Sequence, residues 1–105
     1  MQLEELIRQA IQDRRPVSLR YEDAPYGART VHPHVLFRTS TGKICVDSFQ
    51  VDGPTSSGGA LPDWRPFNLT RILGAELLEG RFEIAPGLNL ASPKYANGLL
   101  AHVAV

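Results

Sequence analysis

The hydrophobic period of the chain changes abruptly at Pro16, and this change constrains the fold more than any other feature of the sequence. Before Pro16, apolar residues repeat at the spacing of one helical face, and they are Leu3, Leu6, Ile7, Ala10 and Ile11. After it, apolar and polar residues alternate from Val17 to Glu22, which is the period of a half-buried strand. A helix followed by β structure is therefore predicted, and the helix must end before Pro16 because the residue preceding a proline avoids the α region.

The next two apolar runs predict a β-hairpin. They cover residues 29–38 and 43–50, and Thr41-Gly42 between them is typical of a tight turn. Pro33 lies inside the first run and cannot donate a hydrogen bond to a neighbouring strand. We therefore expect this strand to lie at an edge of the sheet or to be interrupted at Pro33.

The second half of the chain is less regular. Residues 52–63 are rich in Gly, Ser and Pro and predict a flexible loop inside the domain. Residues 64–72 alternate as a further strand, whereas 73–82 fit both periods, with strand favoured. Ser92-Pro93 has the residue types of a helix N-cap and first turn, which predicts a short helix carrying Tyr95, Leu99 and Val103 on one face.

One helix and about five short antiparallel strands indicate a single, mainly β domain in a chain of 105 residues. Small sheets of this kind remove their exposed edges by curling. The predicted fold is a small SH3-like or Sm-like antiparallel β-barrel with an N-terminal helix. Residues 1–82 are expected to form this unit, and residues 83–105 a C-terminal extension that packs on the barrel or on a partner.

Composition excludes several classes of protein. Eleven Lys and Arg residues balance eleven Asp and Glu residues, so the whole molecule is not expected to be attracted to anionic partners, although the basic residues gather between residues 14 and 71. The single cysteine, Cys45, excludes an internal disulfide framework. No apolar run approaches the roughly 20 residues needed to span a bilayer, and no signal-like segment opens the chain, so a cytoplasmic location is expected and a membrane is not an expected partner.

Three stretches together resemble the WYL family of small ligand-sensing domains. The first runs from Ile7-Arg8-Gln9-Ala10-Ile11 to a strand ending in Tyr21, the second is Arg29-Thr30-Val31-His32-Pro33, and the third is Arg65-Pro66-Phe67-Asn68-Leu69-Thr70-Arg71-Ile72. Their order and spacing also fit, over roughly residues 3 to 82. The resemblance implies an Sm-like barrel that usually serves as the sensor domain of bacterial transcription regulators and binds nucleic acids or nucleotide-like ligands.

The sequence departs from the family pattern at two points. Ile44-Cys45-Val46 stands where the family has the Trp-Tyr-Leu tripeptide that names it, so an aromatic surface expected there is missing. The helix-turn-helix common in the family is not found in these 105 residues. We therefore expect a partner chain to supply any domain that reads a DNA operator.

The resemblance implies a ligand site made of Arg65, Arg71, Arg29, Tyr21 and His32. A guanidinium forms paired hydrogen bonds to phosphate that a lysine does not form. Two structural alternatives stay open. Arg71 or Arg29 pairs with Asp47 or Glu22, and the ring of Tyr21 fills the core instead of stacking on a base.

A chemically different reading uses His32 and His34, which share one face of the predicted strand, together with Cys45 on the paired strand. Such a trio suits a metal ion, or a thiol nucleophile with a histidine base. Short matches of this kind are unspecific, so we expect no metal, no cofactor and no catalytic residues.

The leading functional hypothesis is a non-enzymatic ligand-binding module for nucleic acid or a nucleotide-like ligand, acting in bacterial regulation. The alternative is an adaptor for protein interaction or oligomerisation, which uses a free barrel edge or the apolar residues near the C-terminus. Those residues are Leu88, Leu90, Leu99, Leu100, Val103 and Val105.

Overall fold

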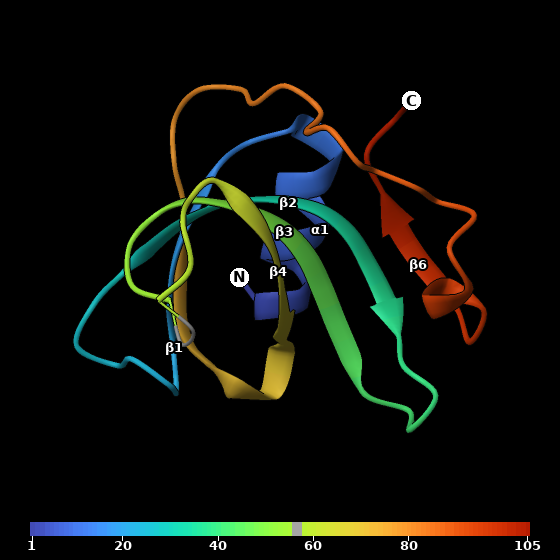
Figure 1. The fold of residues 1–105 in the computed structure, drawn as a ribbon, viewed down its shortest axis with the longest axis horizontal. Helices are drawn as coiled ribbons and strands as arrows, with labels where there is room; N and C mark the ends of the chain where they lie inside the picture. Colours follow the sequence, from blue (N-terminus) through green and yellow to red (C-terminus); the bar gives the residue numbers. More distant parts are fainter. Residues whose placement is uncertain (56–57) are drawn as a thin grey trace.

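The computed structural model describes residues 1–55 and 58–105, and within these ranges it contains one α-helix, six strands and two short 3-10 helices (Figure 1). The helix α1 spans Leu3–Asp13, and the strands are β1 (Val17–Tyr21), β2 (Arg29–Arg38), β3 (Ile44–Asp52), β4 (Asp63–Asn68), β5 (Ile72–Leu77) and β6 (Leu99–His102). The 3-10 helices are η1 (Leu69–Arg71) and η2 (Pro93–Tyr95). The predicted mainly β architecture with an N-terminal helix is confirmed, while Ser56-Ser57 of the predicted flexible loop lies outside the described residues.

The strands form one antiparallel sheet in the order β4-β3-β2-β1-β5, and Figure 1 shows β2, β3 and β4 strongly curved. No ladder joins β4 to β5 in the part of the chain that is described, so the sheet is not closed and the predicted barrel is not confirmed. The predicted strand 64–72 is wrong at its end. The side chain of Asn68 accepts a hydrogen bond from Thr70 N, and this cap turns the backbone into η1 before β5 begins.

β2 changes its partner at Pro33. One edge of β2 follows β3, whereas the other edge pairs with β1 as far as Val31 and with β6 from Val35 onward. The register against β3 also shifts between Pro33 and Val35. The predicted interruption is confirmed, but it reverses the alternation, so that Leu36 joins Val31 in the core instead of facing outward.

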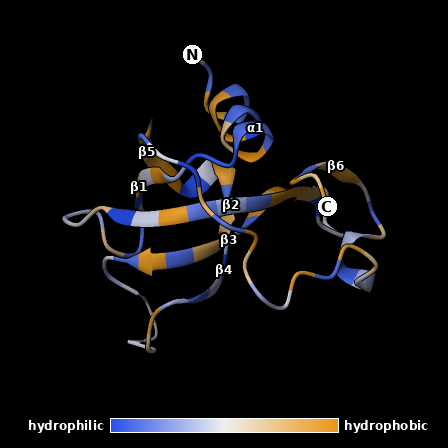
Figure 2. Ribbon diagram, turned by 90° about the horizontal axis from the view of Figure 1, so that it is seen from above, coloured by the Kyte–Doolittle hydropathy of each residue, from blue (hydrophilic) through white to orange (hydrophobic). Residues whose placement is uncertain are grey.

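α1 packs its apolar stripe against one side of the sheet, as Figure 2 shows, and Ile7, Ala10 and Ile11 are buried there. The helix ends at Arg14, whose backbone is left-handed (φ 52°) and whose N–H bonds the last helical carbonyls. The predicted stop before Pro16 is confirmed. No helix within the described ranges is long and apolar enough to cross a membrane.

Residues 83–105 join the body of the protein through β6 and through Val103, which is fully buried. Ser92 caps η2 as predicted, but the helix is a single turn. The predicted helical face with Leu99 and Val103 is wrong, because Gly98 adopts φ +138° and the chain then extends along the free part of the β2 edge. In the segment 73–82, the favoured strand is confirmed as far as Leu77.

Gly53 lies where the end of β3 approaches the start of β2. A Cβ at Gly53 would lie 2.5 Å from Ala28 O and 2.6 Å from Arg29 Cα, and φ is +99°. Gly53→Ala is therefore expected to lower the free energy of unfolding by about 2 to 4 kcal/mol, from a backbone clash added to left-handed strain. Urea unfolding measures this loss.

Gly42→Ala is the matched control. Gly42 has φ +83° but no neighbouring atom within 4 Å of an added Cβ, so only the strain of about 1 kcal/mol remains. Equal losses in the two variants would contradict the close approach at Gly53.

Candidate functional site

Four of the five predicted site residues line one hollow of about 280 Å³, on the side where the sheet is open between β4 and β5. We call it the arginine hollow, and its lining residues are Tyr21, Asp23, Arg29, Arg65, Pro66, Phe67 and Arg71. The end of β1, the start of β2, the middle of β4 and the end of η1 meet here. These elements are far apart in the sequence, so the sheet topology brings the three guanidiniums to one place.

Arg29 forms the floor of the arginine hollow. Only 2% of it is exposed, and its guanidinium lies 5.5 Å from the centre of the Tyr21 ring and 5.4 Å from that of Phe67. It pairs with the carboxylate of Asp23, but its Nε has no hydrogen-bond partner among the described residues. A buried cation with an unmet donor suits an additional anionic acceptor.

Arg71 and Arg65 stand at the rim, each paired with an exposed carboxylate. Arg71 Nε lies 3.2 Å from Glu22 Oε1, and both side chains are half exposed. Arg65 Nη1 donates to Asp63 Oδ2 over 2.9 Å, a bond that lowers the pKa of Asp63. Exposed pairs contribute little to stability and are screened by salt. Both guanidiniums can therefore exchange their carboxylates for a ligand without breaking the fold.

The structural alternative for the arginines holds in part. Arg71 pairs with Glu22 as considered, and Arg29 pairs with Asp23 instead of Glu22 or Asp47. The pairs leave the arginine hollow accessible beside them.

Tyr21 positions the arginines more than it faces solvent. It is 8% exposed, and its hydroxyl accepts a hydrogen bond from Asn68 N at 2.9 Å. The guanidinium of Arg71 lies 5.1 Å from the ring centre, and the edge of the ring meets Phe67. The ring therefore holds Arg29 and Arg71 by cation–π contact while it fills the core.

Two more buried polar atoms on the same face of the sheet lack partners. They are Ser48 Oγ and Gln50 Oε1, both without a hydrogen bond within the described part of the chain. Their strand positions alternate with Asp47 and share the face of Val46, which lies in the core. Unmet polar groups near a hollow indicate a polar occupant, either ordered water or a ligand.

His32 lies apart from the arginines, so the predicted grouping of all five residues is wrong at this position. It is not among the residues that line the arginine hollow, and its ring stacks on Phe82 at 4.8 Å with an interplanar angle of 4°. The cause is the alternation of β2, which places His32 on the face opposite Val31.

The geometry of the strands also separates the proposed metal ligands. Cys45 pairs with Phe37, whereas His32 pairs with Phe49. Over residues 1–55 and 58–105, no group of three His, Cys, Asp or Glu side chains is placed to hold a metal ion. Burial, followed by the charge of Asp47, raises the pKa of the Cys45 thiol, which does not favour a nucleophilic thiolate.

His34 is fully buried and uses both ring nitrogens. Nδ1 lies 2.7 Å from His32 O, and Nε2 accepts a hydrogen bond from Ala85 N at 3.0 Å, which ties the chain beyond β5 to β2. A neutral ring with its proton on Nδ1 satisfies both contacts. Burial lowers the pKa of His34 from 6.5, because the charged form is poorly solvated there.

We therefore expect stability to fall in mild acid. Between the lowered pKa of folded His34 and the value of 6.5 in the unfolded chain, the unfolded chain binds more protons, so the free energy of unfolding is full above about pH 6.5 and declines as the pH falls. Burial lowers the pKa of His32 as well and adds to this trend. Urea unfolding from about pH 7.5 to about pH 5 measures the decline. His34→Gln should reduce the slope and the exposed His102→Gln should keep it, whereas a flat profile in the unmodified chain would contradict the assignment.

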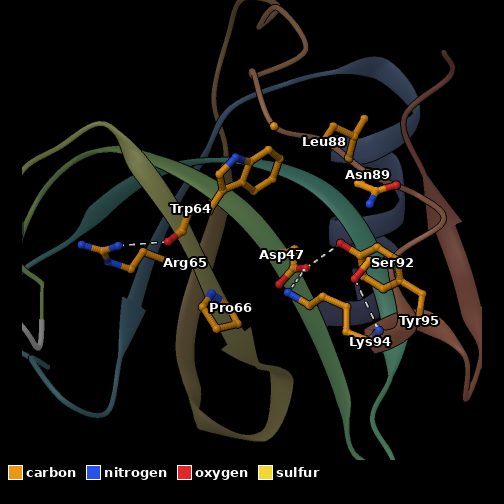
Figure 3. Close-up of a pocket in the computed structure, with 10 residues that line it drawn as sticks. Asp47, Trp64, Arg65, Pro66, Leu88, Asn89, Ser92, Lys94 and Tyr95 are labelled. Atoms are coloured by element: carbon orange, nitrogen blue, oxygen red, sulfur yellow. Dashed lines mark hydrogen bonds and ion pairs between the residues drawn. The ribbon is translucent and has the colours of Figure 1, made fainter.

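A second hollow of about 310 Å³ lies on the other face of β4, and sequence reasoning missed it. We call it the outer hollow. Figure 3 shows its main side chains, with Trp64 and Pro66 on β4, Asp47 on β3, and Leu88, Asn89 and Tyr95 on the C-terminal segment. Trp64 Nε1 donates to Pro86 O at 2.8 Å and so holds this segment against the sheet.

Asp47 is the buried acid of the outer hollow, with 4% of the residue exposed. Its Oδ2 accepts from Tyr95 Oη and from Lys94 Nζ, each at 2.7 Å. Burial, then this hydrogen bond, raises the pKa of Tyr95 well above its usual range, so the phenol keeps its proton. Trp64 was a visible signal, because an aromatic residue between prolines invites attention, but the contacts of Asp47 depend on the path of residues 83–98, which no periodicity predicts.

Comparison of the chain with protein-family models, curated proteins and solved structures finds no match. The WYL resemblance therefore stays a hypothesis that depends on three sequence stretches, and function must be argued from the site itself.

Proposed function

We propose that this chain is a non-enzymatic ligand-binding module whose arginine hollow takes the phosphate of a nucleotide-like ligand or of a nucleic acid. We further propose that the curved sheet is an open form of an SH3-like or Sm-like barrel related to WYL domains, acting in bacterial regulation. The strand order β4-β3-β2-β1-β5, with η1 linking the two outer strands, supports this fold assignment.

One observation carries the proposal. Arg29, Arg65 and Arg71 reach a single hollow from three elements, and the most buried of them has an unmet donor. Three guanidiniums against the single lining carboxylate of Asp23 leave a local excess of positive charge in a protein of zero net charge. Guanidinium forks match the oxygen geometry of phosphate, which makes phosphate the ligand group of choice.

The adaptor alternative receives less support. Val103 is fully buried, and Leu88 and Leu100 pack partly against the core, so much of the apolar surface that motivated a partner is used within the chain. Val105 is exposed, as are Met1, Tyr26 and Leu73. Single exposed apolar residues are normal on a protein surface.

The direct test is a titration with short single-stranded oligonucleotides and with nucleoside monophosphates at about 50 mM and about 200 mM salt. We expect saturable binding that weakens as the salt concentration rises, because phosphate contacts release counterions. Binding that is absent at the lower salt concentration contradicts the proposal.

A further inference from the structure

The outer hollow is a built site that the proposed function does not use. The face of β4 that carries Trp64 and Pro66 is opposite to the face that carries Phe67, because successive side chains of a strand alternate. Figure 3 shows Arg65 extending away from Asp47. Any ligand of the outer hollow therefore makes its own contacts, separate from those of Arg29 and Arg71.

The chemistry of the outer hollow is set by Asp47. Both hydrogen bonds that this carboxylate accepts from described residues end on Oδ2, which leaves Oδ1 without a donor. An ionised carboxylate offers about four acceptor positions, so about two remain at Oδ1. Lys94 already neutralises the charge of Asp47, so a second cation would gain little. A neutral group with adjacent N–H donors fits this acceptor best.

The walls of the outer hollow favour a flat ring. Trp64 and Tyr95 line it together with Leu88 and Pro66, which gives aromatic and apolar surface on more than one side. Contacts hold both aromatic rings in place, since the Trp64 ring meets Phe49 edge-on and the Tyr95 ring meets Phe37 edge-on. Rings held in this way bind a planar group at little entropic cost.

We propose that the outer hollow binds a planar heteroaromatic group with adjacent neutral N–H donors, of which a guanine-type base is the best match, with its donors on Asp47 Oδ1 and its ring among Trp64, Leu88 and Tyr95. This site goes beyond the proposed phosphate site, and it needs no phosphate on the ligand.

The test uses free nucleosides and the fluorescence of Trp64, the single tryptophan of the chain. Guanosine should change the emission saturably, and adenosine and uridine should bind at least about tenfold more weakly because each offers fewer donors to Oδ1. Equal responses to the three nucleosides, or no saturable response to guanosine, would overturn the proposal.

Two variants locate the binding. Asp47→Asn should weaken guanosine binding by about tenfold or more, because the amide offers one acceptor oxygen in place of two. Asn89 is exposed at the mouth of the outer hollow, so Asn89→Phe should block entry while the chain stays folded, and it decides the question if Asp47→Asn does not fold. Retained guanosine binding in Asn89→Phe contradicts the site.

Arg71→Gln separates this inference from the proposed function. It should leave guanosine binding unchanged, because Arg71 lines only the arginine hollow. Phosphate-dependent binding without any guanosine response leaves the proposed function standing and removes the outer site. The reverse pattern removes the proposed function and leaves the outer site.

Discussion

Replacing Arg65 and Arg71 together by Gln is expected to weaken the binding of phosphate-bearing ligands by about 100-fold, because each guanidinium supplies a charge-assisted pair of hydrogen bonds. The salt dependence should change as well. Each lost phosphate contact is expected to lower the slope of log affinity against log salt concentration by about one. Both arginines are tied only to exposed carboxylates, so the variant should fold normally. Titration of the variant with the same oligonucleotides at two salt concentrations measures both effects.

The matched control replaces Arg8 and Arg38 by Gln. Arg8 also forms an exposed ion pair, with Glu4 at 3.0 Å, and neither arginine lines the arginine hollow. This control removes the same charge from the surface, so it should keep most of the affinity. An equal loss in both double variants would show that only overall charge matters, and the arginine hollow would then have no role.

The largest effect on stability is expected from Phe67→Ala. Phe67 is 1% exposed and lies in the central core, with the Tyr21 ring at 5.1 Å and the Arg29 guanidinium at 5.4 Å. Removing a buried phenyl ring costs about 3 to 5 kcal/mol through lost burial and a residual cavity. A domain of this size has only about 5 to 15 kcal/mol in total. Urea unfolding should therefore show a large shift to lower midpoint.

Phe49→Ala is the comparison for this loss. Phe49 is half-buried on the opposite face of β3 and touches neither Tyr21 nor Arg29 in an aromatic or cation–π contact. Its replacement should cost clearly less and leave ligand binding in place. If Phe49→Ala destabilises the chain as much as Phe67→Ala, the core is not centred where we describe it.

Local period predicted much of the fold. The 3.6-residue repeat up to Ile11 and the alternation after Val17 predicted α1 and β1, and Thr41-Gly42 predicted the turn between β2 and β3. The bulge beside Pro33 was predictable as an interruption. Its effect on Leu36 was not, because the direction of a side chain after a bulge depends on the register with the neighbouring strand.

The site divides in the same way. Arg29, Arg65, Arg71 and Tyr21 were selected by resemblance and meet in one hollow, whereas His32 was selected by its place in the same stretch and lies on the other face. The bond between Asp47 and Tyr95 joins residues 48 positions apart, and the hydrogen bond from Ala85 to His34 joins residues 51 apart. Contacts of this length arise from tertiary packing, and short-range patterns in the sequence do not reveal them.

The central claim is that the arginine hollow binds phosphate, and the side-chain Nε–H signals of Arg29, Arg65 and Arg71 in a ¹H–¹⁵N NMR titration test it most directly. With a nucleoside monophosphate, we predict that all three signals shift along one saturation curve and that Arg29 Nε–H moves strongly, because its donor is unmet in the free protein. Signals that stay in place at saturating ligand, or shifts confined to Arg8 and Arg38, would contradict the claim.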